Sequence, residues 1–341
     1  MCQVFYVFFG ILSSIIYLYY YLKENPIMFQ SILLFVMGLV LLVKGADFFV
    51  DGASSIAAKL KVPSLIIGLT VVSLGTSLPE AAVSISASLS GSNGISLGNV
   101  IGSNMFNLLV VIGVSALIMP IMTDRDILKR DLPVNIAITA ILLIMLLDGN
   151  LSRSDSAILL IMLATYMFIL IRSALKSRID ADEAKMLSWA KSVIFSIMGV
   201  AAIIFGGDIV VDNASIIATS LGMGETLVGL TIVSIGTSLP ELVTSIVAAK
   251  KGDSGIAMGN AVGSCIFNIL FILGMAGVIH PMAAEFAFII DTSILIGVSC
   301  LMLFFAFTNR MTIRTEGAIS TLVYVAYTAY IIMRAFHIWI F

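Results

Sequence analysis

The feature that most constrains this chain is that it contains the same segment twice. Residues 45–120 align without a gap to residues 206–281 at a constant offset of 161, and 36 of the 76 aligned positions are identical. Such a repeat indicates an internal duplication, so the fold is expected to consist of two equivalent halves. A side chain with a special role in one half should therefore have a counterpart 161 residues away.

The chain is too apolar for a water-soluble domain. Of its 341 residues 60% are hydrophobic and 11% charged, and its mean hydropathy is +1.13. These values are typical of a membrane protein with many spans. A net charge of -2 leaves no basic surface for nucleic acid, and the three cysteines follow no metal-ligand or redox spacing. The sequence therefore predicts an all-α polytopic membrane protein without nucleic-acid partners or cofactors.

Ten apolar stretches have about the 20-residue length that a bilayer requires. Each half contains five, and because five is odd the second half enters the membrane with the opposite polarity. The halves are thus predicted to be inverted repeats, residues 28–172 and 192–341, joined by a cytoplasmic linker at 173–191. The predicted spans are residues 29–58, 65–88, 96–119, 132–147, 156–171, 192–219, 226–249, 256–279, 286–307 and 318–338.

Lysine and arginine residues set the predicted orientation. Fourteen of the 18 basic residues fall in loops on one side of these ten spans. The positive-inside rule puts those loops in the cytoplasm and residue 28 outside. The apolar segment 1–27 lacks the features of a cleaved signal peptide and is predicted to be an additional transmembrane helix. Because Lys23 would then lie outside, a translation start at Met28 is an alternative.

One face of the second span, and the same face of the seventh, is lined with oxygen atoms. Both spans contain the hexapeptide GTSLPE, which places Glu80 and Glu241 near mid-membrane. Ser and Thr there commonly serve helix packing, whereas a carboxylate costs several kcal/mol and is by default a functional candidate. Pro79 and Pro240 leave carbonyls of the preceding turn without helical partners. The residues sharing these faces are Ser73, Thr76, Ser77, Glu80 and Ser84, and Ser234, Thr237, Ser238, Glu241 and Ser245.

The next span of each half adds a second polar stripe. The segments GNVIGSNMFN and GNAVGSCIFN place an Asn, a Ser and an Asn at every fourth position, on one helix face. These residues are Asn99, Ser103 and Asn107, and Asn260, Ser264 and Asn268. Carboxylate, hydroxyl, amide and carbonyl oxygens are the ligands of hard cations such as Ca²⁺, whereas softer metals prefer Cys or His. The stripes therefore predict a hard-cation site between four spans.

Four further carboxylates are duplicated in the long first and sixth spans. They are Asp47 and Asp51 and their counterparts Asp208 and Asp212. The favoured interpretation is structural pairing, with Lys44 as a partner for the first pair. Assistance to ion access is the alternative.

The GTSLPE segments and their two partner segments resemble the paired alpha-repeats of the Na⁺/Ca²⁺ exchanger branch of the cation/Ca²⁺ exchanger superfamily. The resemblance is strongest to its bacterial calcium/sodium antiporters and covers residues 28–341. It implies ten helices in two inverted five-helix repeats in the bacterial inner membrane, with a monomer sufficient for function. It also implies that helices two, three, seven and eight bind ions, while helices one and six move against them.

The resemblance implies a set of ion ligands, and this sequence departs from the family at three of the relevant positions. Asn268 stands where many members have Asp, while Ser73 and Ser234 stand where a small apolar residue is common and add potential ligands. The implied ligands are Thr76, Ser77, Glu80, Ser103 and Asn107 in the first half, and Thr237, Ser238, Glu241 and Ser264 in the second.

The expected function is that of a secondary transporter, not an enzyme. It would exchange Ca²⁺ for Na⁺ by alternating access, and an H⁺-coupled exchanger or a passive cation channel are the alternatives. With only Glu80 and Glu241 ionised, the pocket has a charge of about -2, which one Ca²⁺ or two monovalent ions neutralise. The sequence thus favours a 2:1 stoichiometry over 3:1, and leaves the coupling ion and the oligomeric state open.

Overall fold

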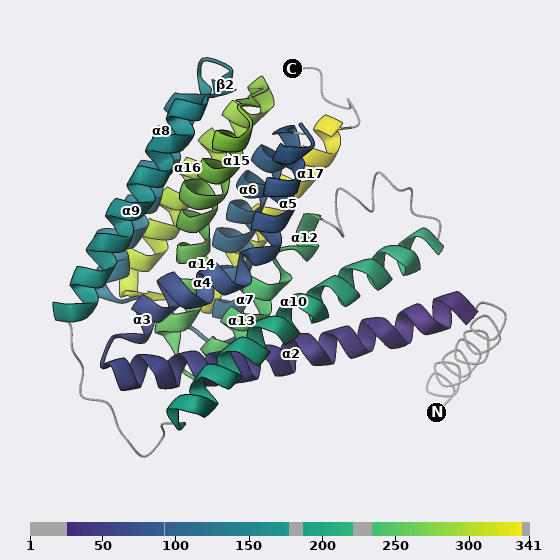
Figure 1. The fold of residues 1–341 in the computed structure, drawn as a ribbon, viewed down its shortest axis with the longest axis vertical. Coiled ribbons are helices and arrows are strands. Elements are labelled where there is room, and N and C mark those ends of the chain that lie inside the picture. Colours follow the sequence, from purple (N-terminus) through teal and green to yellow (C-terminus); the bar gives the residue numbers. More distant parts are fainter. Residues whose placement is uncertain (1–25, 92, 177–186, 221–233, 336–341) are drawn as a thin grey trace, which may run out of the picture.

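The computed structural model describes residues 26–91, 93–176, 187–220 and 234–335, and these residues are almost entirely helical (Figure 1). Apart from Pro26 and Ile27, the predicted N-terminal helix lies outside the described residues. The first half contains α2 (Pro26–Leu60), α3 (Ser64–Ile67), η1 (Gly68–Val72), α4 (Ser73–Thr76), α5 (Leu78–Leu89), α6 (Asn93–Phe106), η2 (Asn107–Val111), α7 (Ile112–Ile118), η3 (Ile127–Asp131), α8 (Leu132–Leu146) and α9 (Arg153–Lys176), where η denotes a π-helix. The second half contains α10 (Trp189–Ser220), α12 (Ser234–Gly236), α13 (Leu239–Lys250), α14 (Ser254–Phe267), η6 (Asn268–Leu273), α15 (Gly274–Ile279), α16 (Phe286–Asn309) and α17 (Arg314–Ala335).

The all-α polytopic fold is confirmed, while the count of ten spans stays a prediction. Within the described residues, seven helices are long and apolar enough to cross a membrane, and the bent pair Ser64–Thr76 and Leu78–Leu89 makes up to eight. Of the other two predicted spans, the fourth is α8, which has only 15 residues but continues from η3 without a break. The seventh, 226–249, is described only from Ser234 onward.

Two small antiparallel sheets show that the halves have opposite orientations. Strand β1 (Ile121–Met122) pairs with β4 (Met311–Thr312), and β2 (Asn150–Leu151) pairs with β3 (Met282–Ala283). Helix α8 runs from the first sheet to the second, whereas α16 runs from the second sheet to the first. The offset of 161 converts β1 into β3 and β2 into β4. Equivalent helices therefore run antiparallel, as an inverted repeat requires.

The long helices α2 and α10 lie side by side across one face of the bundle (Figure 1). Glycines let their backbones approach closely. A Cβ on Gly45 would lie 3.0 Å from the carbonyl oxygen of Gly199, and one on Gly38 would lie 3.0 Å from that of Gly206. Both contacts are again related by the offset of 161, so the duplicated glycines form the contact between the two long helices.

We expect Gly199→Val to weaken this contact. Its Cβ would lie 2.6 Å from the backbone nitrogen of Phe49, which cannot move without shifting α2. Overpacking of this kind costs about 1–3 kcal/mol. Thermal unfolding of the purified protein in detergent should therefore begin at a lower temperature. Gly297→Val is the matched control, because a Cβ at Gly297 has no neighbour within 4 Å; equal shifts in both variants would contradict the prediction.

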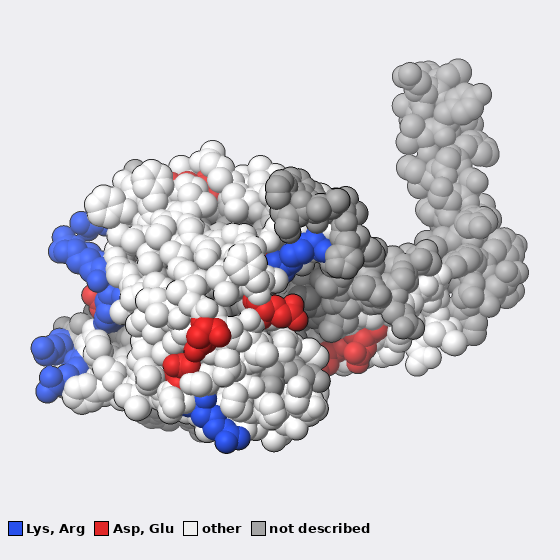
Figure 2. All heavy atoms as spheres, turned by 90° about the horizontal axis from the view of Figure 1, so that it is seen from above, with Lys and Arg blue, Asp and Glu red and all other residues white. Residues whose placement is uncertain are grey.

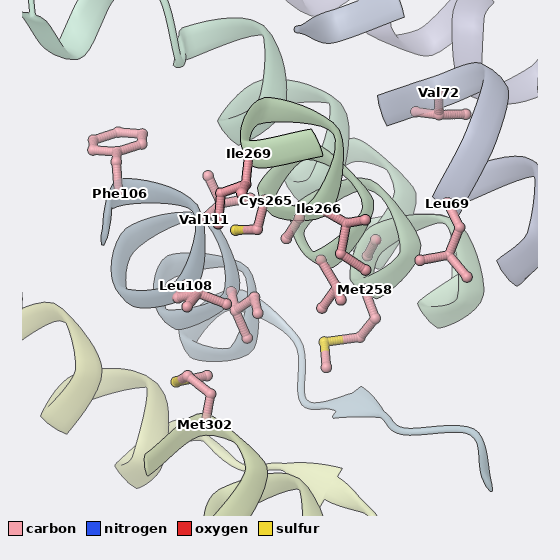
Figure 3. Close-up of a cluster of buried hydrophobic side chains, with 14 of the residues drawn as sticks. Leu69, Val72, Phe106, Leu108, Val111, Met258, Cys265, Ile266, Ile269 and Met302 are labelled. Atoms are coloured by element: carbon pink, nitrogen blue, oxygen red, sulfur yellow. The ribbon is translucent and has the colours of Figure 1, made fainter. Parts of the chain in front are cut away.

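The apolar core lies among the repeated inner helices, and the outer surface is mostly uncharged. Figure 3 shows buried side chains of η1, η2, α14, η6 and α16 meeting in one cluster, with Leu69, Leu108 and Ile269 among them. Seen from above, most of the visible surface is uncharged, and Lys and Arg residues form separate groups on it (Figure 2). An apolar exterior around a packed interior is what a lipid environment favours.

Candidate functional site

Two helix breaks bring the GTSLPE segments into the interior. Between α4 and α5 the chain bends by 50°, and Ser77 has backbone angles φ -84° and ψ 9°. Ser238 has φ -94° and ψ 5° at the same place in the second half, and in both halves Pro lies in the first turn of the following helix. Pro is well tolerated there because it need not donate a hydrogen bond. Glu80 and Glu241 therefore lie at helix N-termini, where the helix dipole favours negative charge.

The two carboxylates are held by serines of the opposite half. Ser77 Oγ donates to Glu241 Oε1 at 2.9 Å, and Ser238 Oγ donates to Glu80 Oε1 at 3.0 Å. Both glutamates are 0% exposed. These crossed bonds place both carboxylates at one site between the halves, where the duplication alone would also allow two separate sites.

Asn99 and Asn260 support the glutamates from behind. Asn99 Nδ2 donates to the backbone oxygen of Glu80 and to Ser84 Oγ, at 3.2 and 2.9 Å. Asn260 makes the equivalent bonds to Glu241 and Ser245, at 3.2 and 3.0 Å. Both Asn side chains thus fix the backbone at the break.

The other predicted ligands fall into two groups. Ser264 Oγ donates to Glu241 Oε1 at 3.4 Å, and Ser103 Oγ lies 3.2 Å from Ser238 Oγ, the hydroxyl that donates to Glu80. Thr76 donates instead to Asn260 Oδ1 at 2.9 Å. Ser73 donates to the Thr70 carbonyl of its own helix at 3.2 Å, a bond that does not involve the carboxylates. The side chain of Ser234 lies outside the described part of the chain.

Several buried polar side-chain atoms of the GTSLPE segments and their partner segments have no hydrogen-bond partner among the described residues. Burying such atoms is costly unless something else binds them. They are Glu80 Oε2, Glu241 Oε2, Thr237 Oγ1, Asn268 Oδ1 and both amide atoms of Asn107. A hard cation takes 6–8 oxygens of these kinds. Within the described residues, no group of three or more His, Cys, Asp or Glu could hold a metal, so a cation here would rely on two carboxylates and neutral oxygens.

The amides of Asn107 and Asn268 are equivalent by the repeat but not in their surroundings. Asn104 Nδ2 donates to the carbonyl oxygen of Cys265 at 3.1 Å, which leaves its Oδ1 to accept from Asn268 Nδ2 at 3.0 Å. The counterpart of Asn104 is Cys265, which has no amide. Asn268 is therefore fixed with its oxygen free, while Asn107 has no such support. Sequence reasoning missed Asn104, although it is one of the few positions where the two partner segments differ.

Among the described residues, the duplicated aspartates form ion pairs in the first half only. Lys44 Nζ lies 3.6 Å from Asp47, as predicted, and Lys251 Nζ lies 2.8 Å from Asp51 and 3.5 Å from Asp47. The counterpart of Lys251 is Ser90.

No lysine or arginine within the described residues pairs with Asp208 or Asp212. Both line a cavity of about 290 Å³ together with Thr237, Pro79 and Pro240. Three of the five residues named here belong to the GTSLPE segments, so this cavity adjoins the carboxylate site.

Comparison with known proteins gives consistent matches along the chain. The family described as sodium/calcium exchanger protein matches residues 30–172 and 191–333. Inner membrane protein YrbG of Escherichia coli is 39% identical over 258 residues, covering 73% of this chain and 79% of that protein. Sodium/calcium exchanger MaX1 of Methanosarcina acetivorans is 34% identical over 339 residues, covering 87% and 97%. A solved structure of the sodium-calcium exchanger NCX_Mj, soaked with Na⁺ and Sr²⁺, superposes with a TM-score of 0.79 at 32% identity, covering 89% and 99%.

Proposed function

The chain belongs to the sodium/calcium exchanger family, and on that premise we propose that it exchanges Ca²⁺ for Na⁺ at a site formed by Glu80 and Glu241. The observation that supports this most is the pair of crossed Ser-to-Glu hydrogen bonds. Each leaves one carboxylate oxygen unbound, and both free oxygens are completely buried. No Lys or Arg of the described residues pairs with either carboxylate. Two such charges in low dielectric favour a bound cation, and the transported ions supply it.

Exchange follows from the charge of the empty site. With both glutamates ionised and no ion bound, a charge of about -2 would have to cross the membrane interior while the protein changes conformation, which is strongly unfavourable. One Ca²⁺ or two Na⁺ remove that cost. Because the halves share the site, movement of α2 and α10 against the remaining helices can expose it to one side and then the other. The close glycine contact lets those two helices move as one unit.

The proposed ligands are the two glutamates and the neutral oxygens around them. Ser77, Ser238, Ser103 and Ser264 contact a carboxylate or its serine partner, and the unpartnered oxygens of Thr237, Asn107 and Asn268 complete the set. Ser73 is the weaker candidate, because its hydroxyl donates to the Thr70 carbonyl of its own helix and makes no hydrogen bond to a carboxylate. Thr76 stays a candidate, because its hydroxyl donates to Asn260 Oδ1 and its oxygen keeps lone pairs for a cation.

The protein is a multi-pass membrane protein, and its orientation completes the proposal. The helix ends next to β1 and β4 adjoin the basic loops. The positive-inside rule therefore puts this sheet on the cytoplasmic side of a bacterial inner membrane. The repeats would then be residues 28–172 and 192–341, with a cytoplasmic linker at 173–191.

Calcium flux into proteoliposomes tests the proposal directly. Gradients of Na⁺, K⁺ and H⁺ are imposed one at a time, and uptake of ⁴⁵Ca²⁺ is measured for each. We expect Ca²⁺ uptake only when an outward Na⁺ gradient drives it. Uptake driven by a pH gradient without Na⁺ would identify an H⁺-coupled exchanger instead. Uptake without any counter-ion, at rates far above transporter turnover, would identify a passive channel.

We predict that two Na⁺ exchange for one Ca²⁺. Asn268 is neutral and its amide is bound by Asn104, so the described site has two carboxylates to neutralise. A 2:1 exchange moves no net charge, so an imposed membrane potential should leave the uptake rate unchanged. The measurement sets a K⁺ diffusion potential with valinomycin. Acceleration by an inside-positive potential during Ca²⁺ uptake would contradict 2:1, since 3:1 exchange then moves one positive charge outward.

A further inference from the structure

A second cavity lies at the end of the molecule where β1 pairs with β4. Arg125, Lys129 and Arg310 surround a cavity of about 640 Å³ whose other lining residues are Leu128, Cys300, Leu303, Phe304 and Phe307. Phe304 and Phe307 are 61% and 72% exposed, so the cavity is open on the side of α16 that faces the surroundings. We propose that this cavity binds an anionic phospholipid of the cytoplasmic leaflet.

The three cations have no carboxylate partner among the described residues. Arg130, in the same segment, is by contrast saturated: its guanidinium binds Asp131 at 2.8 Å and Asp126 at 3.3 Å. The chain thus neutralises one cation of this segment and leaves two neighbours and Arg310 unneutralised around one cavity. Three unpaired cations fit a ligand that carries negative charge.

The position of each group matches the parts of a phospholipid. Arg310 follows the last residue of α16, and its carbonyl accepts a hydrogen bond from the Thr123 amide at 2.8 Å, which joins it to the segment of Arg125 and Lys129. Phe307 and Phe304 lie three and six residues earlier, about 5 and 9 Å deeper along the helix. The headgroup would thus lie at the cations and an acyl chain along the phenylalanines.

The duplication supplies an internal comparison. At the opposite end of the molecule, the positions equivalent to Arg125, Lys129 and Arg310 are Phe286, Ile290 and Gly149. The inverted copy of this cavity therefore has none of the three charges. The positive-inside rule accounts for more basic residues at one end, but it does not require three unpaired ones over one apolar cavity.

Cys300 makes the cavity accessible to a direct experiment. It is exposed, whereas Cys265 is buried, so in a Cys2→Ser background neutral N-ethylmaleimide reports on Cys300. The full-length protein is reconstituted in phosphatidylcholine vesicles with or without phosphatidylglycerol. At about 1 kcal/mol per basic residue, three cations favour the anionic headgroup by roughly 100-fold. We expect labelling of Cys300 to slow several-fold when phosphatidylglycerol is present.

Two sets of substitutions decide the interpretation. Arg125→Gln, Lys129→Gln and Arg310→Gln together should abolish the protection, with equal labelling rates in both vesicles. The control set is Arg172→Gln, Lys176→Gln and Lys191→Gln, which removes three exposed cations that do not line the cavity. In this set phosphatidylglycerol should still protect Cys300. Labelling that is insensitive to phosphatidylglycerol in the unsubstituted protein would overturn the proposal, as would loss of protection in the control set. Neither readout depends on Ca²⁺ transport, so this test of the lipid site is independent of the proposed exchange.

Discussion

Replacing Glu80 or Glu241 by Gln is expected to abolish Ca²⁺ transport. Each substitution removes one of the two charges that neutralise Ca²⁺ while keeping the shape of the side chain. The serine of the opposite half can still donate to the remaining oxygen, so folding should be preserved. Removing one partner of a buried charge pair costs about 3–5 kcal/mol, which lowers affinity by at least about 100-fold. Uptake of ⁴⁵Ca²⁺ into Na⁺-loaded proteoliposomes should fall to background in both variants.

The matched control is Glu316→Gln. Glu316 is also a buried carboxylate, only 8% exposed, but it lies in α17, where it accepts hydrogen bonds from the Ile313 amide and Thr308 Oγ1. Its neutral variant should transport Ca²⁺ at the normal rate. Near-normal uptake in Glu80→Gln and Glu241→Gln would remove the central claim, because the two charges would then be dispensable.

The duplication made much of the fold and the site predictable. A carboxylate repeated in an identical hexapeptide is informative because burying each copy in the membrane costs free energy. In the structure the two copies lie close together, each bound by the serine of the other segment. The inverted orientation followed from an odd number of spans, and the strand pairs confirm it. The breaks in the helices coincide with Pro79 and Pro240, whose missing N–H groups predict them.

The other features of the site depend on contacts between helices, which the spacing of residues along one helix does not predict. Helical spacing assigned Ser73 to the polar face of the span. In the structure its hydroxyl donates to a backbone carbonyl of its own helix, as Ser side chains in helices commonly do. Asn104 lies next to Ser103 in sequence and off the predicted stripe. Its role arises only where α6 meets α14. Lys251 was missed for the same reason, because it reaches the aspartates of α2 from the end of α13. Spacing within one helix specifies a face but not its neighbour.

Asn268→Asp is expected to change the stoichiometry of exchange. A third carboxylate raises the charge of the empty site to about -3, which three Na⁺ neutralise but two do not. Exchange should then become electrogenic, and an inside-positive potential should accelerate Ca²⁺ uptake in proteoliposomes. Asn107→Asp adds the same charge at the equivalent position and should have the same effect on coupling. If the Asn268→Asp variant transports Ca²⁺ at a rate that does not change with membrane potential, this side chain takes no part in ion binding.

The two variants should differ in stability, because only Asn268 is held by a neighbouring amide. Its Nδ2 donates to Asn104 Oδ1, and a carboxylate there would bring two acceptors together. Leaving such buried acceptors unpaired costs about 1–3 kcal/mol. Neither amide atom of Asn107 has a hydrogen-bond partner among the described residues, so without Ca²⁺ Asn107→Asp should unfold at the higher temperature of the two. Adding Cys265→Asn to Asn107→Asp would introduce the missing amide and should lower that temperature toward the value of Asn268→Asp. Equal unfolding temperatures for the two single variants would mean that the Asn104 bond does not distinguish the halves.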